Sequence, residues 1–452
     1  MPPTSHPADA ASDASDKSML VRAVIASTVG TAIEWYDFFL YGTVAGLVFA
    51  KVFFPKEDPL TGTLLAFTTY AVGFVARPVG AAIFGHYGDR IGRKAVLVST
   101  LLLMGVATLL VGLVPSYASI GIWGAVALTV LRFVQGIGVG GEWGGSVLLA
   151  MEWTKSHGNR GFIASWPQFG VPMGLFLANG AVFLFSRIAG DQFNSWGWRI
   201  PFLLSIVLVG VGLWIRLGIL ETPVFAKLVK ENKIEKAPVA EVFKRQPGSI
   251  FICALIRLAE QTPFYIYTAF IFAYGVTQLK VSRDLLLNAI MVFAVVEFFL
   301  IPLSGYLSDK FGRKRTYLFG AALNIVMGFV FFRMLDTLNP TIIFFAIVMG
   351  AIPHSIVYGT QASLIAEQFT PRLRYSGASI GYQLASVIAG GPAPLIATAL
   401  LAQYHSGAVV GLYMAVCAII GFVATLFLHE YSGRDVSEEY EHVGGHTRPL
   451  VP

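Results

Sequence analysis

A ten-residue turn occurs twice in this chain of 452 residues, and it limits the possible folds more than any other feature. Residues 85–94 read GHYGDRIGRK, and residues 305–314, 220 positions later, read GYLSDKFGRK. Five positions are identical: Gly85/Gly305, Asp89/Asp309, Gly92/Gly312, Arg93/Arg313 and Lys94/Lys314. Each copy joins two long apolar runs. This repeat predicts two related halves, each with the turn after its second membrane span.

The apolar runs around the turns have the length of membrane spans. About 20 helical residues cross the roughly 30 Å of hydrocarbon in a bilayer. Hydrophobic residues make up 55% of the chain and charged residues 13%, whereas a soluble domain carries about 25% charged residues. We predict an all-α polytopic membrane protein with twelve transmembrane helices, at 21–50, 63–86, 95–114, 120–150, 160–186, 198–219, 249–274, 284–306, 316–335, 341–366, 376–402 and 407–429.

The connectors between these runs predict the orientation. Those on one side, including both repeated turns, carry most of the Lys and Arg residues, and the richer side normally faces the cytoplasm. Both termini then lie in the cytoplasm, and the net charge of +6 does not indicate a nucleic-acid partner. The predicted parts are a disordered cytoplasmic tail (1–20), a first six-span half (21–219), a cytoplasmic linker (220–248), a second six-span half (249–429) and a cytoplasmic tail (430–452).

Several ionisable residues lie inside the apolar runs. A charged side chain in hydrocarbon costs several kcal/mol, so one that persists is expected to be paired or to line a water-filled cavity. The candidates are Glu34, Asp37, Arg77, Arg132, Glu142, Arg257, Glu260, Glu297 and His354.

Glu34 and Asp37 in the first span are three residues apart, so both point from one face of a helix. Arg132, in the fourth span, is expected at a comparable depth. An arginine opposite two carboxylates can hold one ionised while burial raises the proton affinity of the other. This arrangement predicts a proton carrier. The alternative is a permanent ion pair that joins two helices.

Arg257 and Glu260 repeat the same spacing in the seventh span. Either they neutralise each other, or Arg257 faces a substrate carboxylate, with Gln261, Tyr265 and Tyr267 available for hydroxyl groups.

Two further residues also have two interpretations. Arg77 either contacts an anion or joins the second span to a neighbour. His354, the only histidine within a span, is either a hydrogen-bonded packing residue or a proton carrier.

The sequence offers little support for an enzyme. Residues 136–141 (GIGVGG) match the dinucleotide-binding pattern by letter, but they lie within a membrane helix with no preceding strand. Glycines four residues apart, such as Gly136 and Gly140, instead allow two helices to approach closely. No nucleophile motif, metal-ligand cluster or phosphate-binding loop occurs, so we expect no enzymatic activity and no cofactor.

The motifs resemble those of a known transporter family. The two turns and residues 132–136 (RFVQG) resemble signatures of the major facilitator superfamily. Residues 34–38 (EWYDF), 77–80 (RPVG), 198–202 (WRIPF) and 375–383 (YSGASIGYQ) resemble its metabolite:proton symporter subfamily. Within that subfamily, residues 256–260 (IRLAE) and 267–270 (YTAF) are most similar to the shikimate-transporter branch.

The resemblance implies two pseudo-symmetric six-helix bundles around a central cavity that opens to each side of the membrane in turn. It implies a monomer whose partners are a small organic anion, protons and the lipid bilayer of the bacterial inner membrane. The candidate site residues are, for proton coupling, Asp37, Glu34 and Arg132; for substrate binding, Arg257, Glu260, Gln261, Tyr265, Tyr36, Gln168, Tyr382 and Gln383; for gating, Gly85, Asp89, Arg90, Arg93, Asp309 and Arg313; and for anion contact, Arg77 and Arg199.

We therefore expect a proton-coupled symporter that imports a shikimate-like hydroxylated carboxylate. The alternatives within the same scaffold are a proton-driven efflux antiporter for a drug or toxic anion, and a symporter for a dicarboxylate, tricarboxylate or zwitterionic osmolyte. A membrane receptor is a rival from another class, but it predicts a cytoplasmic signalling domain, for which the linker and the tail are too short.

Overall fold

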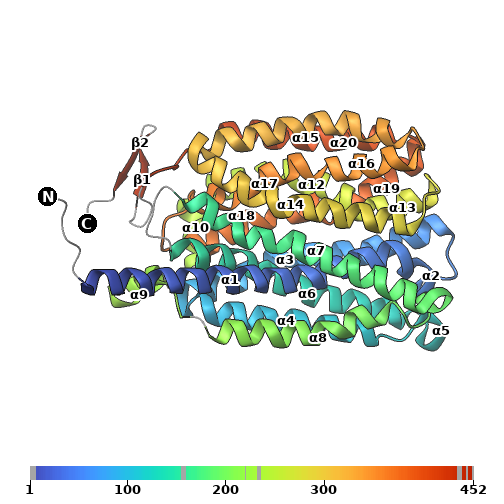
Figure 1. The fold of residues 1–452 in the computed structure, drawn as a ribbon, viewed down its shortest axis with the longest axis horizontal. Helices are drawn as coiled ribbons and strands as arrows, with labels where there is room; N and C mark the ends of the chain where they lie inside the picture. Colours follow the sequence, from blue (N-terminus) through green and yellow to red (C-terminus); the bar gives the residue numbers. More distant parts are fainter. Residues whose placement is uncertain are drawn as a thin grey trace.

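The computed structural model describes residues 7–153, 159–218, 220–231, 236–434, 440–443 and 446–449, and these are almost entirely helical (Figure 1). The first half contains α1 (Pro7–Val44), the π-helical turn η1 (Ala45–Phe49), α2 (Ala50–Phe53), α3 (Pro59–Ile91), α4 (Arg93–Leu113), α5 (Tyr117–Ile120), α6 (Trp123–Glu152), α7 (Arg160–Ala189), the 3₁₀ turn η2 (Gly190–Asn194) and α8 (Arg199–Leu217). The linker contains α9 (Pro223–Lys230) and α10 (Pro238–Arg245).

The second half contains α11 (Pro247–Ile256), α12 (Leu258–Tyr265), the π-helical turn η3 (Ile266–Phe270), α13 (Ile271–Thr277), α14 (Arg283–Phe311), α15 (Arg313–Leu335), α16 (Pro340–Met349), α17 (Ala351–Ala366), α18 (Arg374–Ala385), the π-helical turn η4 (Ser386–Gly390), α19 (Pro392–Tyr404) and α20 (Gly407–Leu426). Two short antiparallel strands, β1 (Tyr440–Val443) and β2 (His446–Pro449), follow.

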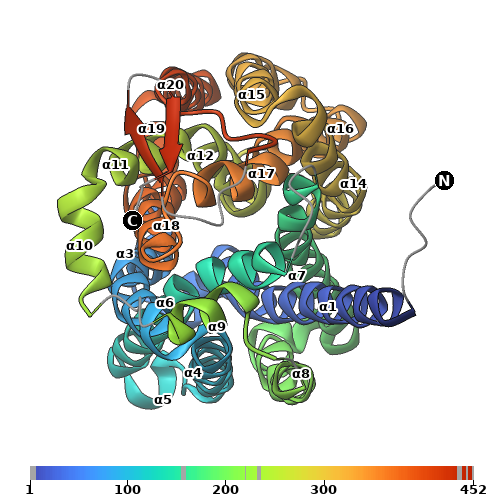
Figure 2. The same cartoon turned by 90° about the vertical axis from the view of Figure 1, so that its left-hand side faces the viewer.

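The helices form two bundles that lie side by side, one from each half of the chain (Figure 2). In the first bundle, α3 packs on α6, α1 on α7 and α4 on α8; in the second, α15 packs on α20 and α14 on α17. The bundles meet along a seam where α7 contacts α14 and α3 contacts α18. The all-helical membrane fold predicted from the sequence is confirmed.

Eleven helices within the described residues are long and apolar enough to cross a membrane, one fewer than predicted. The difference lies in the predicted span 249–274, which is broken into α11, α12, η3 and α13. The break falls at Arg257, between α11 and α12. There the N–H of Glu260 bonds to the carbonyl of Arg257, so the carbonyl of Ile256 is left without this helical partner. The hydroxyl of Tyr317 donates to the carbonyl of Ile256 at 2.7 Å instead.

Pro263 disturbs the same span one turn later. Proline has no N–H, so the carbonyl four residues before it, that of Ala259, loses its helical partner. The side-chain amide of Asn324 on α15 donates to this carbonyl at 3.0 Å. The second half thus stabilises a broken helix with side chains of its neighbours, and the break places a candidate substrate residue, Arg257, at a helix end.

The two ends of the chain differ from the predicted tails. Helix α1 begins at Pro7, within the segment 1–20 for which disorder was predicted. Four alanines between residues 8 and 14 account for this difference, because alanine is the strongest helix former. At the other end, β1 and β2 lie within the tail 430–452.

Small residues set the distance between α3 and α6. A Cβ added to Gly136 would lie 2.8 Å from the Cβ of Ala76, and one added to Gly140 would lie 2.9 Å from the backbone nitrogen of Ala81. The predicted close approach at these two glycines is confirmed. It brings α6, which carries Arg132 and Glu142, directly against the helix that carries Arg77.

We predict that Gly140→Leu separates α3 from α6 and destabilises the protein by roughly 1–3 kcal/mol, the usual cost of overfilling a packed interface. Thermal unfolding of the detergent-solubilised protein measures this cost. Gly210→Leu is the matched control, because nothing lies within 4 Å of a Cβ at this exposed helical position. Equal melting temperatures for the two variants would contradict the packing argument.

Candidate functional site

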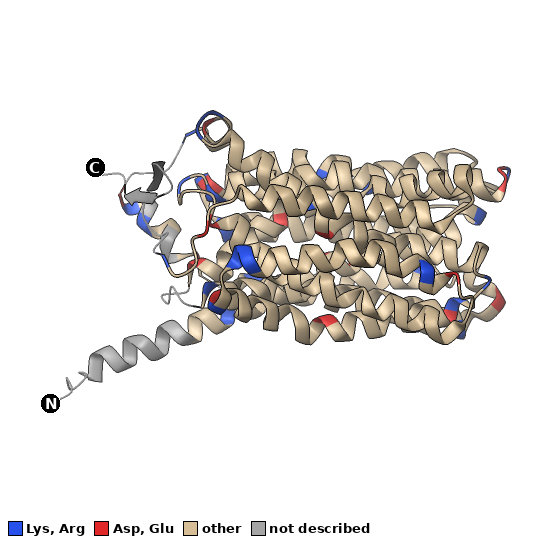
Figure 3. Ribbon diagram, turned by 90° about the horizontal axis from the view of Figure 1, so that it is seen from above, with Lys and Arg blue, Asp and Glu red and all other residues tan. Residues whose placement is uncertain are grey.

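At one end of the molecule, which we call the motif end, the two repeated turns form matching ion clusters. In each half, the arginine of the turn binds the aspartate of the turn and a glutamate at the end of a later helix. The pairs are Arg93 with Asp89 (3.3 Å) and Glu152 (3.5 Å), and Arg313 with Asp309 (3.1 Å) and Glu367 (2.7 Å). These side chains are at most 4% exposed. Figure 3 shows charged residues gathered at both ends of the molecule.

The two aspartates also reach across the seam. Asp89 accepts hydrogen bonds from the backbone N–H and the hydroxyl of Ser376 at 3.0 and 2.8 Å. Asp309 accepts hydrogen bonds from the backbone N–H groups of Gly161 and Phe162 at 2.9 and 2.8 Å. Ser376 lies in the first turn of α18, and the other two donors lie in the first turn of α7. A helix start offers unpaired N–H groups and favours an anion. These two clamps therefore hold the bundles together at the motif end.

The other predicted gating residues have different positions. A Cβ at Gly85 would lie 3.1 Å from the Cα of Ser376, so glycine allows α3 to approach α18 at the clamp. Arg90 is exposed, and its Nη1 lies 3.2 Å from Nε2 of His86 on the same helix. Arg90 thus lies outside the clamps and their ion clusters, to which Gly85, Asp89, Arg93, Asp309 and Arg313 all belong.

A buried triad of charges lies deeper in the first half. Nη1 of Arg216 binds Oε1 of Glu34 at 2.8 Å, and its Nη2 lies 3.5 Å from Oε1 of Glu142. The hydroxyls of Thr31 and Ser146 also donate to Glu142. All three charged side chains are about 1% exposed. The guanidinium of Arg216 thus joins the carboxyl groups of Glu34 and Glu142, and through them the helices α1, α6 and α8.

This triad corrects one prediction. Arg132 was expected opposite Glu34 and Asp37, but Glu34 pairs with Arg216 on α8. Gly30, one helical turn before Glu34, makes room for this pair, since a Cβ there would lie 2.6 Å from Cζ of Arg216. Arg216 was not predicted as a site residue. It lies one residue from the end of α8, where a basic residue looks like an ordinary interfacial charge.

Asp37 is 1% exposed, and neither of its carboxylate oxygens has a hydrogen-bond partner among the described residues. Thr108 lies beside it. The hydroxyl of Thr108 accepts a hydrogen bond from Gln135 at 2.7 Å, and Gln135 accepts one from Arg132 at 3.1 Å. A chain of polar groups thus connects Asp37 to Arg132, although the two side chains form no ion pair.

Two buried arginines surround the ring of Phe38. Cζ of Arg132 lies 4.0 Å from the ring centroid, and Cζ of Arg77 lies 4.1 Å from it. Both arginines have a relative exposure of 0%. No nitrogen of the Arg77 guanidinium, and neither Nε nor Nη2 of Arg132, has a hydrogen-bond partner within the described part of the chain. The sequence left open whether Arg77 joins two helices, and the structure gives it aromatic contacts without a carboxylate.

The aromatic layer around these arginines crosses the seam. Phe38 and Phe74 of the first half lie 6.3 and 5.0 Å from Tyr265 of the second, between ring centroids. Phe39 lies 5.7 Å from Phe264. These ring contacts close the seam between the two halves beside the arginines.

The second half contains its own chain of buried charges. Arg257 binds Glu260 at 3.0 Å, and Nε2 of His354 lies 3.4 Å from the other oxygen of Glu260. Nδ1 of His354 forms a hydrogen bond with Glu297. Arg257 and Glu260 do neutralise each other, as one of the two interpretations proposed. The chain continues, however, through a histidine that is not a simple packing residue.

Three predicted substrate residues lie at the seam, on the motif side of the aromatic layer. The ring of Tyr382 stacks on Trp143 with centroids 3.7 Å apart, and Cζ of Arg257 lies 3.3 Å from the Tyr382 centroid. Gln168 accepts a hydrogen bond from Trp143 at 2.8 Å and donates one to the carbonyl of Tyr358 at 3.1 Å. Gln383 donates to the carbonyl of Val139 at 3.3 Å. These stacking and hydrogen-bond contacts join the two halves at the seam, and they break when the halves separate.

Three other predicted residues are engaged within one half. The hydroxyl of Tyr36 donates to the carbonyl of Pro201, and the amide of Gln261 donates to Ser386. Arg199 donates to the carbonyls of Gly112 and Val114 at 2.9 and 2.6 Å, which caps the end of α4. The guanidinium of Arg199 is therefore already used in this structure.

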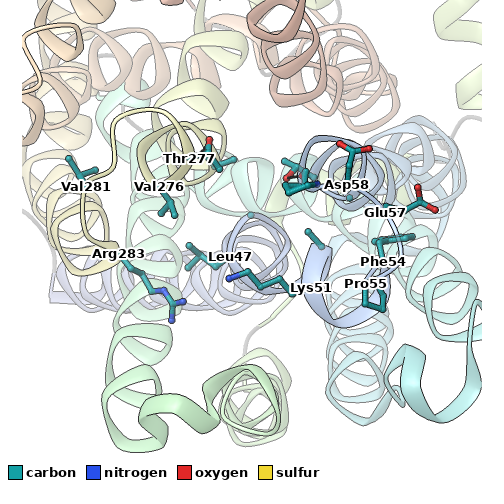
Figure 4. Close-up of a pocket in the computed structure, with 16 residues that line it drawn as sticks. Leu47, Lys51, Phe54, Pro55, Glu57, Asp58, Val276, Thr277, Val281 and Arg283 are labelled. Atoms are coloured by element: carbon teal, nitrogen blue, oxygen red, sulfur yellow. Dashed lines mark hydrogen bonds between the residues drawn. The ribbon is translucent and has the colours of Figure 1, made fainter.

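The end opposite the motif end contains an open pocket of about 430 Å³ between the two bundles (Figure 4). Lys51 and Arg283 lie on one side of it, and Glu57 and Asp58 lie on the other. Hydrogen bonds from Thr61 and Leu60 lower the pKa of Asp58, so this group stays ionised. The molecule is thus closed by clamps at the motif end and indented at the other.

The described residues contain no group of three His, Cys, Asp or Glu side chains suited to a metal ion. What the centre offers is unpaired charge: two guanidinium groups and one carboxylate. These groups can bind an anion and a proton.

Comparison with known proteins identifies the family to which this fold belongs. The model of the Major Facilitator Superfamily matches residues 28–394 and 289–451. The chain is 42% identical to the shikimate transporter of Escherichia coli over 90% of its own length and 94% of that protein's. It is 41% identical, with the same coverage, to the inner membrane metabolite transport protein YhjE of Escherichia coli. The proline/betaine transporter of Escherichia coli is 32% identical, covering 93% of this chain and 85% of the relative.

A solved structure shares the fold. The proton:xylose symporter XylE bound to 6-bromo-6-deoxy-D-glucose superimposes with a TM-score of 0.75 at 18% identity, covering 93% of this chain and 98% of that one.

We predict that Asp89→Ala opens the clamp at α18. The variant loses two hydrogen bonds to a charged acceptor, each worth about 1.5–3 kcal/mol, so amide exchange in residues 374–380 should rise at least about tenfold. Hydrogen–deuterium exchange measures this, and Asp309→Ala should have the same effect on residues 160–165. Asp336→Ala, at an exposed aspartate near the opposite end, is the control. Unchanged exchange in both clamp variants would contradict this assignment.

Proposed function

The chain belongs to the major facilitator superfamily, and from that premise we propose that it is a proton-coupled symporter for a small organic acid. The proposal depends mainly on one observation: Arg77 and Arg132 are completely buried without a carboxylate partner. An unpaired charge in a protein interior costs several kcal/mol. An unpaired charge inside a membrane span therefore indicates a functional site, and here a substrate anion would be the missing partner.

The surroundings of the two arginines favour a small carboxylate. Each guanidinium can donate two parallel hydrogen bonds to a carboxylate. The rings of Phe38 and Phe74, which already contact the arginines, offer an apolar surface to the rest of the substrate. Tyr265 supplies a phenol from the second half. A cyclic acid with hydroxyl groups fits this mixture, and the name of the shikimate transporter supports the same substrate class.

We assign the coupled proton to Asp37. Glu34 has a permanent cationic partner in Arg216, whereas Asp37 has none. An isolated carboxylate in a dry interior is far less stable than the neutral acid. Asp37 therefore holds a proton while the site is occluded, and it releases the proton when water enters. The polar chain through Thr108 and Gln135 connects this event to Arg132 and hence to the substrate anion.

Transport then proceeds by alternating access in the bacterial inner membrane, with the motif end in the cytoplasm. Substrate and proton enter from the opposite end, where the pocket of Figure 4 lies, and the aromatic layer closes over them. The clamps of Asp89 and Asp309 then separate, and substrate and proton leave at the motif end. The clamps reform when the empty carrier returns.

Proteoliposomes test the proposal directly. Labelled shikimate should accumulate when an inward proton gradient is imposed, and accumulation should stop when a protonophore dissipates the gradient. Citrate, α-ketoglutarate and betaine serve as alternative substrates. Uptake that ignores the gradient would exclude symport, and release of preloaded substrate driven by inward protons would indicate an efflux antiporter.

We predict that Asp37→Asn strongly lowers proton-driven accumulation of shikimate but preserves exchange between labelled and unlabelled shikimate. The substitution removes the exchangeable proton while it leaves the anion site intact. Counterflow assays at equal pH on both sides measure the exchange. Full accumulation by the variant would remove Asp37 from the mechanism.

We predict that Arg77→Gln lowers the affinity for shikimate by roughly 30-fold or more, because removing one partner of a buried charge pair costs about 2–5 kcal/mol. Thermal-shift titration of the purified protein measures the affinity. Arg333→Gln, at an exposed arginine on α15, is the matched control. Equal affinity in the two variants would show that Arg77 does not contact the substrate.

A further inference from the structure

The chain of buried charges in the second half has no role in the mechanism above. It connects Arg257, Glu260, His354 and Glu297, which come from the break between α11 and α12, from α12, from α17 and from α14. None of the four residues is more than 2% exposed. A purely structural link between helices would need only one ion pair, so the length of this chain requires an explanation.

The hydrogen bonds of His354 indicate its protonation state. Both ring nitrogens face carboxylate oxygens, Nε2 that of Glu260 and Nδ1 that of Glu297. Neutral imidazole has one N–H donor and one acceptor nitrogen, and two acceptors facing each other repel. Only the imidazolium ion donates from both nitrogens. The geometry therefore fits a positively charged His354.

The charge balance of the cluster leads to the same result. Arg257 compensates Glu260, and within the described part of the chain His354 is the one cationic neighbour of Glu297. Among the described residues, the other titratable groups around the cluster are the phenols of Tyr265, Tyr317, Tyr358 and Tyr382, which carry no charge. With one proton on the histidine the cluster is neutral, and without it the cluster carries one uncompensated negative charge. Burial therefore requires one bound proton.

The cluster is connected to the moving parts of the molecule. Arg257 donates to the carbonyl of Tyr382 at 2.6 Å and lies against its ring. Tyr382 stacks on Trp143 of the first half, so separation of the bundles at the motif end breaks this stacking. On the other side, the His354 ring stacks on Phe264, with centroids 4.3 Å apart, and Phe264 belongs to the aromatic layer. The cluster thus contacts the seam on both sides of the layer.

We infer that His354 is a second proton carrier, held as an imidazolium ion between Glu260 and Glu297, so that two protons accompany each substrate molecule. This inference rests on the proposed function. His354 takes up this proton from the water outside while the cluster is open to that side, and it keeps the proton while the cluster is occluded. Opening at the motif end disturbs Arg257, exposes the cluster to water and releases the proton. For a monocarboxylate, two protons and one anion carry a net charge of +1 inward.

Proteoliposomes that contain a trapped pH indicator test the stoichiometry, with shikimate as the probe. Parallel measurements of proton entry and of labelled shikimate entry should give about two protons per molecule for the unmodified protein, and about one for His354→Gln and Glu297→Gln. The Glu297 variant keeps a hydrogen-bond acceptor for the histidine and removes only the charge that holds its proton. His405→Asn, at an exposed histidine, is the control and should keep the ratio of two. A ratio of one in the unmodified protein, or an unchanged ratio in both variants, overturns the inference.

A second measurement does not depend on transport. In ¹⁵N NMR spectra of the solubilised, histidine-labelled protein, the signals lost in His354→Gln belong to His354. Protonation of both ring nitrogens at neutral pH supports the inference, and protonation of only one overturns it. If shikimate uptake does not follow the proton gradient, the proposed function fails, while the ring protonation still tests the state of His354 separately.

Discussion

The cost of placing a charge in hydrocarbon organises this molecule. Every ionisable side chain inside the spans must either pair with an opposite charge in the protein or bind one that belongs to the transported molecule. Arg216 pairs with Glu34 and Glu142, and the arginine of each repeated turn pairs with carboxylates of its own half. The charges that stay unmatched are Asp37, Arg77 and Arg132. The two arginines lie together around Phe38, so their unmatched positive charge is concentrated at one place.

The internal repeat explains how this centre opens and closes. Each turn caps the start of a helix in the other half, Asp89 on α18 and Asp309 on α7, so the two clamps are related by the pseudo-symmetry of the chain. The first span of each half also has a π-helical turn at a corresponding position, η1 at 45–49 and η3 at 266–270. Irregular turns of this kind accompany functional sites in helices. Clamps at one end and irregular helices near the other are what a carrier with two alternating openings requires.

The sequence was sufficient for the fold and for the repeated turns with their aspartates and arginines, because repeats and apolar runs depend only on local order along the chain. It was not sufficient for the partners of the buried charges. Glu34 pairs with Arg216, Arg93 with Glu152 and Arg313 with Glu367, and none of these three partners was predicted. Which face of a helix meets which neighbour depends on its rotation about its axis, and packing of the whole bundle decides that rotation. The break at Arg257 was missed for a similar reason, since its freed carbonyl is satisfied by Tyr317 from α15.

The two halves handle their buried charges in opposite ways. In the first half, the central arginines have aromatic neighbours and one amide but no carboxylate, so the site is complete only when an anion is present. In the second half, Arg257, Glu260, His354 and Glu297 satisfy one another, so that cluster is complete when a proton is present. An anion reduces the unmatched positive charge of the first half, and a proton removes the unmatched negative charge of the second. Because an occluded state with unmatched charge is costly, closure around an empty or half-loaded site is disfavoured, and the same electrostatic cost that shapes the fold couples the movement of substrate to that of protons.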